Sequence, residues 1–155
     1  MKFRVSGLAP GPFHHLYGLT DVQLRDQGAM RVIADRPLAF PDRIELRDAQ
    51  AGESLLLVNY THQPASNPYR ASHAIFVLEG ALHAYSRVDE IPQVLRARPL
   101  SLRSFDADDM MLDAELVHGR DAEQSIVRLL ADARAAYIHA HYATRGCYAA
   151  RIERA

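Results

Sequence analysis

Two short, continuous apolar runs stand out in the middle of the chain. Residues 55–58 read LLLV and residues 74–78 read AIFVL, and polar or turn-forming residues flank both runs. Runs of this length are typical of central strands that are covered on both faces. Alternating or shorter apolar stretches predict further strands at residues 3–8, 30–34, 43–46, 100–105, 110–117, 137–142 and 147–152.

A longer segment after residue 121 has the spacing of an amphipathic helix. The stretch DAEQ at residues 121–124 carries the signals of a helix start. The apolar residues that follow form one stripe at helical spacing, namely Ile126, Val127, Leu129, Leu130 and Ala133. We therefore expect Ile126 and Leu130 to be buried against a sheet, whereas Glu123 and Arg128 face solvent.

The order of these elements predicts the fold class. A second, short helix begins at Thr20, where Gln23 completes a capping-box pattern, and it ends at Gly28. Elsewhere strands mostly follow strands, and no repeat or linker divides the 155 residues. This order indicates a single α+β domain over residues 1–155, with a mainly antiparallel sheet of about eight strands and two main helices.

Composition and charge exclude several classes of function. A net charge of −1 lacks the basic footprint of a nucleic-acid-binding or membrane-surface protein. The single cysteine rules out a disulfide within the chain. The N-terminus lacks the apolar core of a signal peptide, and no stretch approaches the roughly 18 apolar residues of a spanning helix. We expect a cytoplasmic protein with neither a nucleic acid nor a membrane as partner, and a homo-oligomer remains open.

The polar loop between the two central strands is the first candidate site. If those strands are antiparallel neighbours, the loop brings its polar residues to one edge of the sheet, where His62, Tyr69, Arg70, Ser72 and His73 would meet. Arg70 would anchor a phosphate or carboxylate, with Tyr69 and Ser72 as further ligand contacts. His62 or His73 would act as general acid or base near neutral pH. The alternative is that both histidines only bond loop carbonyls.

The closing hairpin is the second candidate. In a strand, His139 and His141 point to the same face as Tyr137, and alternation alone would make this face a solvent face. Because Tyr148 shares it in the simplest register, the face has the aromatic content of a partly covered surface. We therefore predict that at least one of these histidines lies in the same cleft as His73 or Arg70. A metal would need three or four ligands, so His-x-His alone is a weak metal signal.

The register of that hairpin decides the role of Cys147. A four-residue loop would place His141 opposite Tyr148 and put Cys147 on the other face. A bulge at Gly146 would instead pair His141 with Cys147 and permit a thiol–imidazole nucleophile pair. Both registers are open, and a lone cysteine is more often a small buried hydrophobe.

Three long motifs carry a family resemblance. They are NYTHQPASNPYRASHAIFV, LRSFDADDMM and AYIHAHYATRGCYAARIERA. Together they resemble a bacterial family known only as domain of unknown function 1203, over most of the chain from about Phe3 to Ala155. The resemblance implies a single-domain bacterial protein, and it implies no activity, substrate or catalytic residue.

Three hypotheses of function follow from these residues. The first is an enzyme-like pocket for a small anionic molecule, in which Arg70 binds the anion, His62 or His73 transfers protons, and the closing hairpin contributes further histidines. The second is a non-catalytic ligand-binding or regulatory module that uses the same pocket. The third is a mononuclear metal site built from the histidines. No phosphate-binding glycine loop, nucleophile elbow or Cys-x-x-Cys motif separates them.

Overall fold

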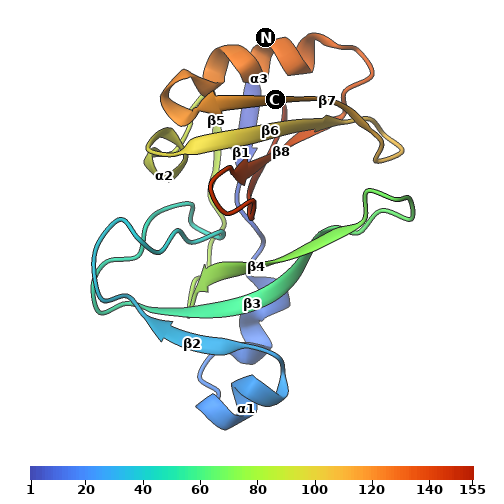
Figure 1. Cartoon of the computed structure of the whole chain (residues 1–155). Coiled ribbons are helices and arrows are strands. Elements are labelled where there is room, and N and C mark those ends of the chain that lie inside the picture. The colour runs from blue at the N-terminus through green and yellow to red at the C-terminus, as the bar shows by residue number, and fades with distance from the viewer.

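The computed structural model describes all 155 residues. Its nine strands form two antiparallel sheets, a large sheet in the upper half of Figure 1 and a small sheet in the lower half. The large sheet has the order β5-β1-β9-β8-β6-β7, with β1 (Phe3–Ser6), β5 (Ser86–Val88), β6 (Pro99–Phe105), β7 (Met111–His118), β8 (Tyr137–Tyr142) and β9 (Tyr148–Arg154). The small sheet has the order β2-β3-β4, with β2 (Met30–Ile33), β3 (Ser54–Gln63) and β4 (Ala71–Leu78).

Helical segments are short and lie outside the sheets. The α-helices are α1 (Asp21–Asp26), α2 (Gln93–Arg96) and α3 (Ala122–Ala131), and the 3-10 turns are η1 (Gly11–Leu16) and η2 (Gly119–Asp121). The prediction of an α+β chain is confirmed. None of the helices is long and apolar enough to cross a membrane.

Helix α3 covers one face of the large sheet (Figure 1). Ile126 and Leu130 are fully buried in the core beneath it, as predicted from the apolar stripe, while Glu123 and Arg128 are exposed. Two residues assigned to the stripe do not belong to it. Val127 is 36% exposed, because a helical step of about 100° turns it away from its neighbour, and Ala133 lies beyond the last helical residue.

The small sheet has a core of its own. The predicted capping box at Thr20 and Gln23 is present, since each side chain bonds the other residue's backbone N–H. It starts α1, and this helix buries Leu24 against β2 and β3. Phe13 and Leu16 of η1 cover the same apolar cluster. Each sheet therefore buries a separate set of apolar side chains.

The prediction of a single sheet is wrong, because the nine strands form two sheets, and two strand assignments also differ from the structure. Residues 43–46 form no strand; only isolated bridges flank them, and Leu46 has a positive φ of 50°. The buried carboxylate of Asp42 holds this loop by accepting bonds from the backbone N–H groups of Ile44, Glu45 and Leu78. Burial raises the pKa of Asp42, and those three N–H donors oppose the shift. Strand β5 was not predicted.

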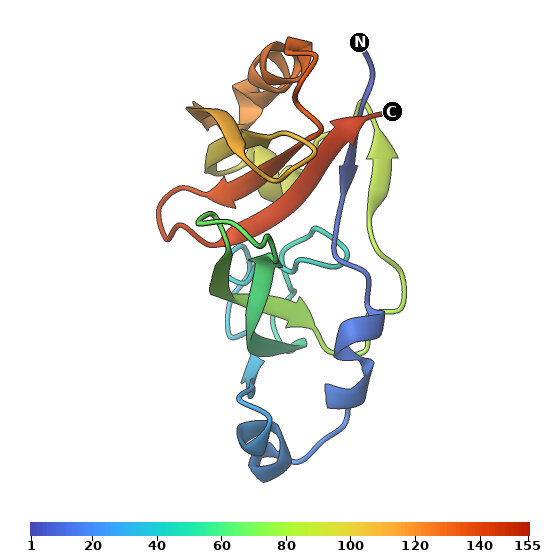
Figure 2. The ribbon, with the colours of Figure 1, turned by 90° about the vertical axis from the view of Figure 1, so that its right-hand side faces the viewer.

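The tip of the β3–β4 hairpin reaches the large sheet. Figure 2 shows this tip against the β8–β9 hairpin. The Nε2 atom of Gln63 donates to the Tyr137 hydroxyl at 2.9 Å, and the Nδ2 atom of Asn67 donates to the carbonyls of Asp108 and Asp109. These contacts place the first candidate loop beside the second candidate hairpin.

Candidate functional site

Three histidines from the two candidate segments meet between the sheets. The ring centroid of His62 lies 5.0 Å from that of His141 and 6.2 Å from that of His139, and His62 stacks on Tyr148 at 5.4 Å. The side chains of His139 and His141 are buried, with 3% and 2% exposure. A solvent-facing histidine face is therefore excluded. We call His62, His139, His141 and Tyr148 the histidine cluster.

Burial keeps the histidine cluster uncharged at neutral pH. Desolvation lowers the pKa of His139 to about 3 and that of His141 to about 4, and it also lowers the pKa of His62. The Nδ1 atoms of His62 and His139 are buried without a hydrogen-bond partner, whereas Nδ1 of His141 lies 3.0 Å from the Gly146 carbonyl oxygen. An imidazole with so low a pKa is not poised for proton transfer near pH 7.

Aromatic packing extends the histidine cluster along the sheet. The ring of Tyr137 stacks on Phe105 at 5.3 Å, and the Arg151 guanidinium lies 3.8 Å from the Tyr137 centroid. The Tyr137 hydroxyl accepts from Gln63 and donates to the Asp109 carboxylate. No group of three or more His, Cys, Asp or Glu side chains is arranged to hold a metal ion. The cluster joins the two sheets as a packed interface.

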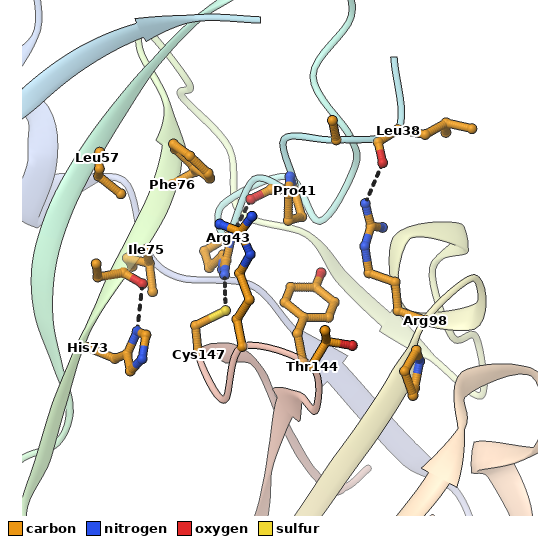
Figure 3. Close-up of a pocket in the computed structure, with 15 residues that line it drawn as sticks. Leu38, Pro41, Arg43, Leu57, His73, Ile75, Phe76, Arg98, Thr144 and Cys147 are labelled. Carbon is orange, nitrogen blue, oxygen red and sulfur yellow. Dashed lines mark hydrogen bonds between the residues drawn. The ribbon is translucent and has the colours of Figure 1, made fainter. Parts of the chain in front are cut away.

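A cavity of about 410 Å³ opens on the other side of the β8–β9 hairpin. Figure 3 shows its walls: the loop with Leu38 and Pro41, strand β4 with His73, and the turn between β8 and β9. Its polar lining residues are Arg43, His73, Arg98, Tyr142, Thr144, Arg145 and Cys147. No carboxylate side chain lines it. We call this the arginine cavity.

Arg43 is the innermost charged group of the arginine cavity. It is only 2% exposed, and its Nε donates to the Tyr148 carbonyl at 2.9 Å while Nη1 donates to the Pro41 carbonyl. Its Nη2 donates to the Cys147 Sγ atom at 3.1 Å, the dashed bond at the centre of Figure 3. No carboxylate pairs with Arg43, so its permanent charge is buried without a counter-ion.

The other two arginines differ in how far they are neutralised. Arg98 makes a two-point ion pair with Asp48 at 2.6 and 3.1 Å, and its guanidinium lies 5.4 Å from the Tyr142 ring centroid. Arg145 lies in the turn between β8 and β9, is exposed, and makes no ion pair. Arg145 is thus the guanidinium most available to a molecule that enters the cavity.

The hairpin register separates Cys147 from the histidines. His141 lies opposite Tyr148, and a bulge does occur, but at Ala149 rather than at Gly146. Because side chains alternate along a strand, Cys147 falls on the face away from His141. The alternative in which Cys147 pairs with His141 as a thiol–imidazole nucleophile is therefore wrong, and the polar partner of Cys147 is Arg43.

The loop residues predicted to form one site do not all meet in one place. His62 enters the histidine cluster, whereas His73 lines the arginine cavity, although it lies close enough for its charge to lower the pKa of His62 and His141. Arg70 is exposed and donates to the Pro64 carbonyl, so it does not line the cavity. Tyr69 packs edge-on against Phe105, and the Ser72 hydroxyl bonds Thr61.

His62, rather than the expected His73 or Arg70, is the loop residue that contacts His139 and His141. Sequence reasoning missed Arg43, Arg98, Tyr142 and Arg145. The available signal was Arg43 at the start of the predicted strand at residues 43–46, since a charged residue that is buried with such a strand needs polar partners.

Fold and site together define an α+β protein with two antiparallel sheets and an arginine-lined cavity beside their junction. A family model described as a protein of unknown function, DUF1203, matches residues 39–154, and the chain belongs to this family. The match is shorter than the resemblance suggested, since it leaves out residues 1–38. Comparison with curated proteins and with solved structures finds no match.

Proposed function

We propose that the arginine cavity binds a small molecule that carries a carboxylate or phosphate group. One observation carries the proposal: three guanidinium groups line the cavity and no carboxylate side chain does. Asp48 neutralises Arg98, but Arg43 and Arg145 have no acidic partner. An excess of positive charge at a cavity wall attracts anions, and guanidinium groups bind planar oxyanions through two parallel hydrogen bonds.

The apolar part of the wall supports a ligand with a hydrophobic portion. Leu57, Ile75 and Phe76 of the small sheet form one side of the cavity. A pocket of a few hundred cubic ångströms with apolar walls and a few polar groups is the usual form of a small-molecule site. The ligand we propose therefore has an anionic end near Arg145 and an apolar end against the small sheet.

The roles expected from the loop change accordingly. Arg145 and Arg43 replace Arg70 as the anion-binding groups, and His73 is the histidine that lines the cavity as general acid or base. As expected from the sequence, we propose that the partner is a small molecule and not a nucleic acid or a membrane, and that the protein is bacterial and cytoplasmic. A non-catalytic ligand-binding module would use the same cavity, and turnover of a bound ligand separates the two.

Binding of simple anions tests the proposal. Inorganic phosphate and benzoate are titrated against the protein at constant ionic strength set by chloride, and the melting temperature and heat of binding are measured. A ligand that binds only the folded state raises the melting temperature. We expect saturable binding, weakened by about three- to tenfold in Arg145→Gln, which loses one charged donor pair.

Arg25→Gln is the matched control, because Arg25 is also exposed and without an ion pair but lies on α1, at the far end of the small sheet. It should bind like the unmodified protein. Binding no stronger than that of chloride, or equal losses in both variants, contradicts the proposal.

A further inference from the structure

We propose that Cys147 is a nucleophile in the arginine cavity and attacks an electrophilic carbon of the bound anion. The inference rests on the proposed function, since it takes the anionic molecule as its substrate. The class is a small carboxylate or phosphate compound whose electrophilic carbon bears a leaving group.

The contact between Arg43 and Cys147 is the first support. The sulfur lies 3.1 Å from Nη2 of a guanidinium that is permanently charged and has no carboxylate partner. The other two acceptors of Arg43 are neutral carbonyl oxygens, so Sγ is its only hydrogen-bond acceptor that can carry a negative charge. The guanidinium therefore lies where negative charge on the sulfur would be stabilised during attack, and the thiolate is the nucleophilic form of cysteine.

Access to the sulfur is the second requirement. Cys147 is 7% exposed and lines the arginine cavity, so a molecule in the cavity can touch it. It lies beside the turn that holds Thr144 and Arg145 (Figure 3). An anion held by Arg145 would therefore have its neighbouring carbon close to Sγ, which is the proximity that accelerates reaction.

Tyr142 supplies an independent observation in the same wall. It is 5% exposed and lines the cavity, and its hydroxyl is buried without any hydrogen-bond partner. The guanidinium groups of Arg43 and Arg98 lie 5.0 and 5.4 Å from its ring centroid. Burial raises the pKa of Tyr142, so the hydroxyl remains a donor. An unpartnered buried donor is costly, and an oxygen of a bound molecule would satisfy it.

The proposed step needs no oxidant or reductant. The Cys147 thiol gives its proton to solvent, an electron pair of the sulfur forms the carbon–sulfur bond, and the bond from that carbon to the leaving group breaks. The leaving group departs with the bonding pair and carries away the negative charge. The guanidinium of Arg43 stays protonated throughout, and Tyr142 donates to an oxygen of the substrate as charge shifts.

Alkylation with a charged and a neutral reagent of the same reactivity class provides the test. Iodoacetate and iodoacetamide both release iodide and add to sulfur, and only iodoacetate carries the carboxylate. Intact mass measured against time gives each rate, with glutathione as the free-thiol reference. We expect the ratio of the iodoacetate to the iodoacetamide rate to exceed that of glutathione by at least about tenfold, because the cavity concentrates anions.

Three variants assign the effect to residues. Cys147→Ser should take up no label, because Cys147 is the only cysteine. Arg145→Gln should lower the rate ratio toward that of glutathione while iodoacetamide still reacts. Arg43→Gln should slow both reagents and Arg43→Lys should restore most of the rate, which a purely structural role of Arg43 would not produce. Arg43→Gln is compared only after its folding is verified by circular dichroism.

The outcomes separate this inference from the proposed function. Saturable phosphate binding together with a thiol no more reactive toward iodoacetate than glutathione overturns the nucleophile and leaves the anion site standing. A reactive thiol with the rate ratio of glutathione and no phosphate binding overturns both, because the cavity then does not select anions. Protection of Cys147 from iodoacetate by phosphate supports both.

Discussion

The histidine cluster and the arginine cavity lie on opposite faces of one hairpin, β8–β9. His139, His141 and Tyr148 point to one face, and Tyr142 and Cys147 to the other. The first face is packed with aromatic rings, its imidazoles are uncharged, and it joins the two sheets. The second keeps a cavity in which two of the three arginines, Arg43 and Arg145, lack acidic partners. The residues with the more familiar catalytic chemistry are therefore the packed ones, and the arginines are the ones that face a ligand-sized space.

Three stability measurements test this difference between the two faces. The first follows the protonation of the histidine cluster, and the other two compare one residue from each face. All use unfolding with urea, in which a shift of the midpoint at constant slope reports the change in the free energy of unfolding.

Acid should produce the largest effect, through the histidine cluster. The pKa values of His139 and His141 in the folded protein, about 3 and about 4, lie below the value of about 6.5 for an exposed histidine. The unfolded chain thus binds more protons below pH 6.5, and stability falls as the pH falls toward 4. We expect a loss of about 1.4 kcal/mol per pH unit for each histidine in this window.

Unfolding measured between pH 6.5 and 5 isolates the histidines. Carboxylates with depressed pKa values, such as Glu53 and Glu79 at about 2, lose their contribution only at lower pH. His139→Phe should lower the slope by the contribution of one histidine, about 1.4 kcal/mol per pH unit, while His141 and His62 still titrate. A free energy of unfolding that stays constant between pH 6.5 and 5 would show that the imidazoles are solvated. It would contradict the conclusion that the histidine cluster is a packed interface.

An arginine from each face gives the next effect. Arg43→Met should lower the free energy of unfolding by about 2–3 kcal/mol, because the carbonyls of Tyr148 and Pro41 lose their donor in a buried place. Arg103 borders the histidine cluster and donates only to the Ser101 hydroxyl, at 3.2 Å, so Arg103→Met should cost less than about 1 kcal/mol. Equal losses in the free energy of unfolding would mean that the hydrogen bonds of Arg43 do not hold the loop at residues 41–48 to β9.

A tyrosine from each face gives the smallest effect and the cleanest contrast. Tyr137→Phe removes bonds to Gln63 and to the Asp109 carboxylate, and we expect a loss of about 1–2 kcal/mol. Tyr142→Phe removes a costly buried hydroxyl without a partner and should raise the free energy of unfolding, by about 1 kcal/mol or less. A clear destabilisation by Tyr142→Phe would show that its hydroxyl has a partner in solution, which would remove the free donor from the cavity wall.

The local elements of this protein follow from short-range patterns in its sequence. Apolar spacing placed α3 and its buried residues Ile126 and Leu130, and the capping pattern placed α1. The two central strands were correctly expected to be antiparallel neighbours, as β3 and β4 are. Alternation along β8 also put His139 and His141 on one face. Such features depend on neighbours within a few residues, where propensity and periodicity act directly.

How those elements combine depends instead on packing between distant parts of the chain. The strands divide between two sheets because each sheet buries its own apolar face, and no local signal assigns a strand to one core or the other. The position of the bulge at Ala149 settled the partner of Cys147, and a single residue of register reverses that outcome. Arg43 reaches Cys147 across 104 positions of the chain. Contacts at that separation arise from packing and burial of the whole molecule, which the pattern of residues along the chain does not encode locally.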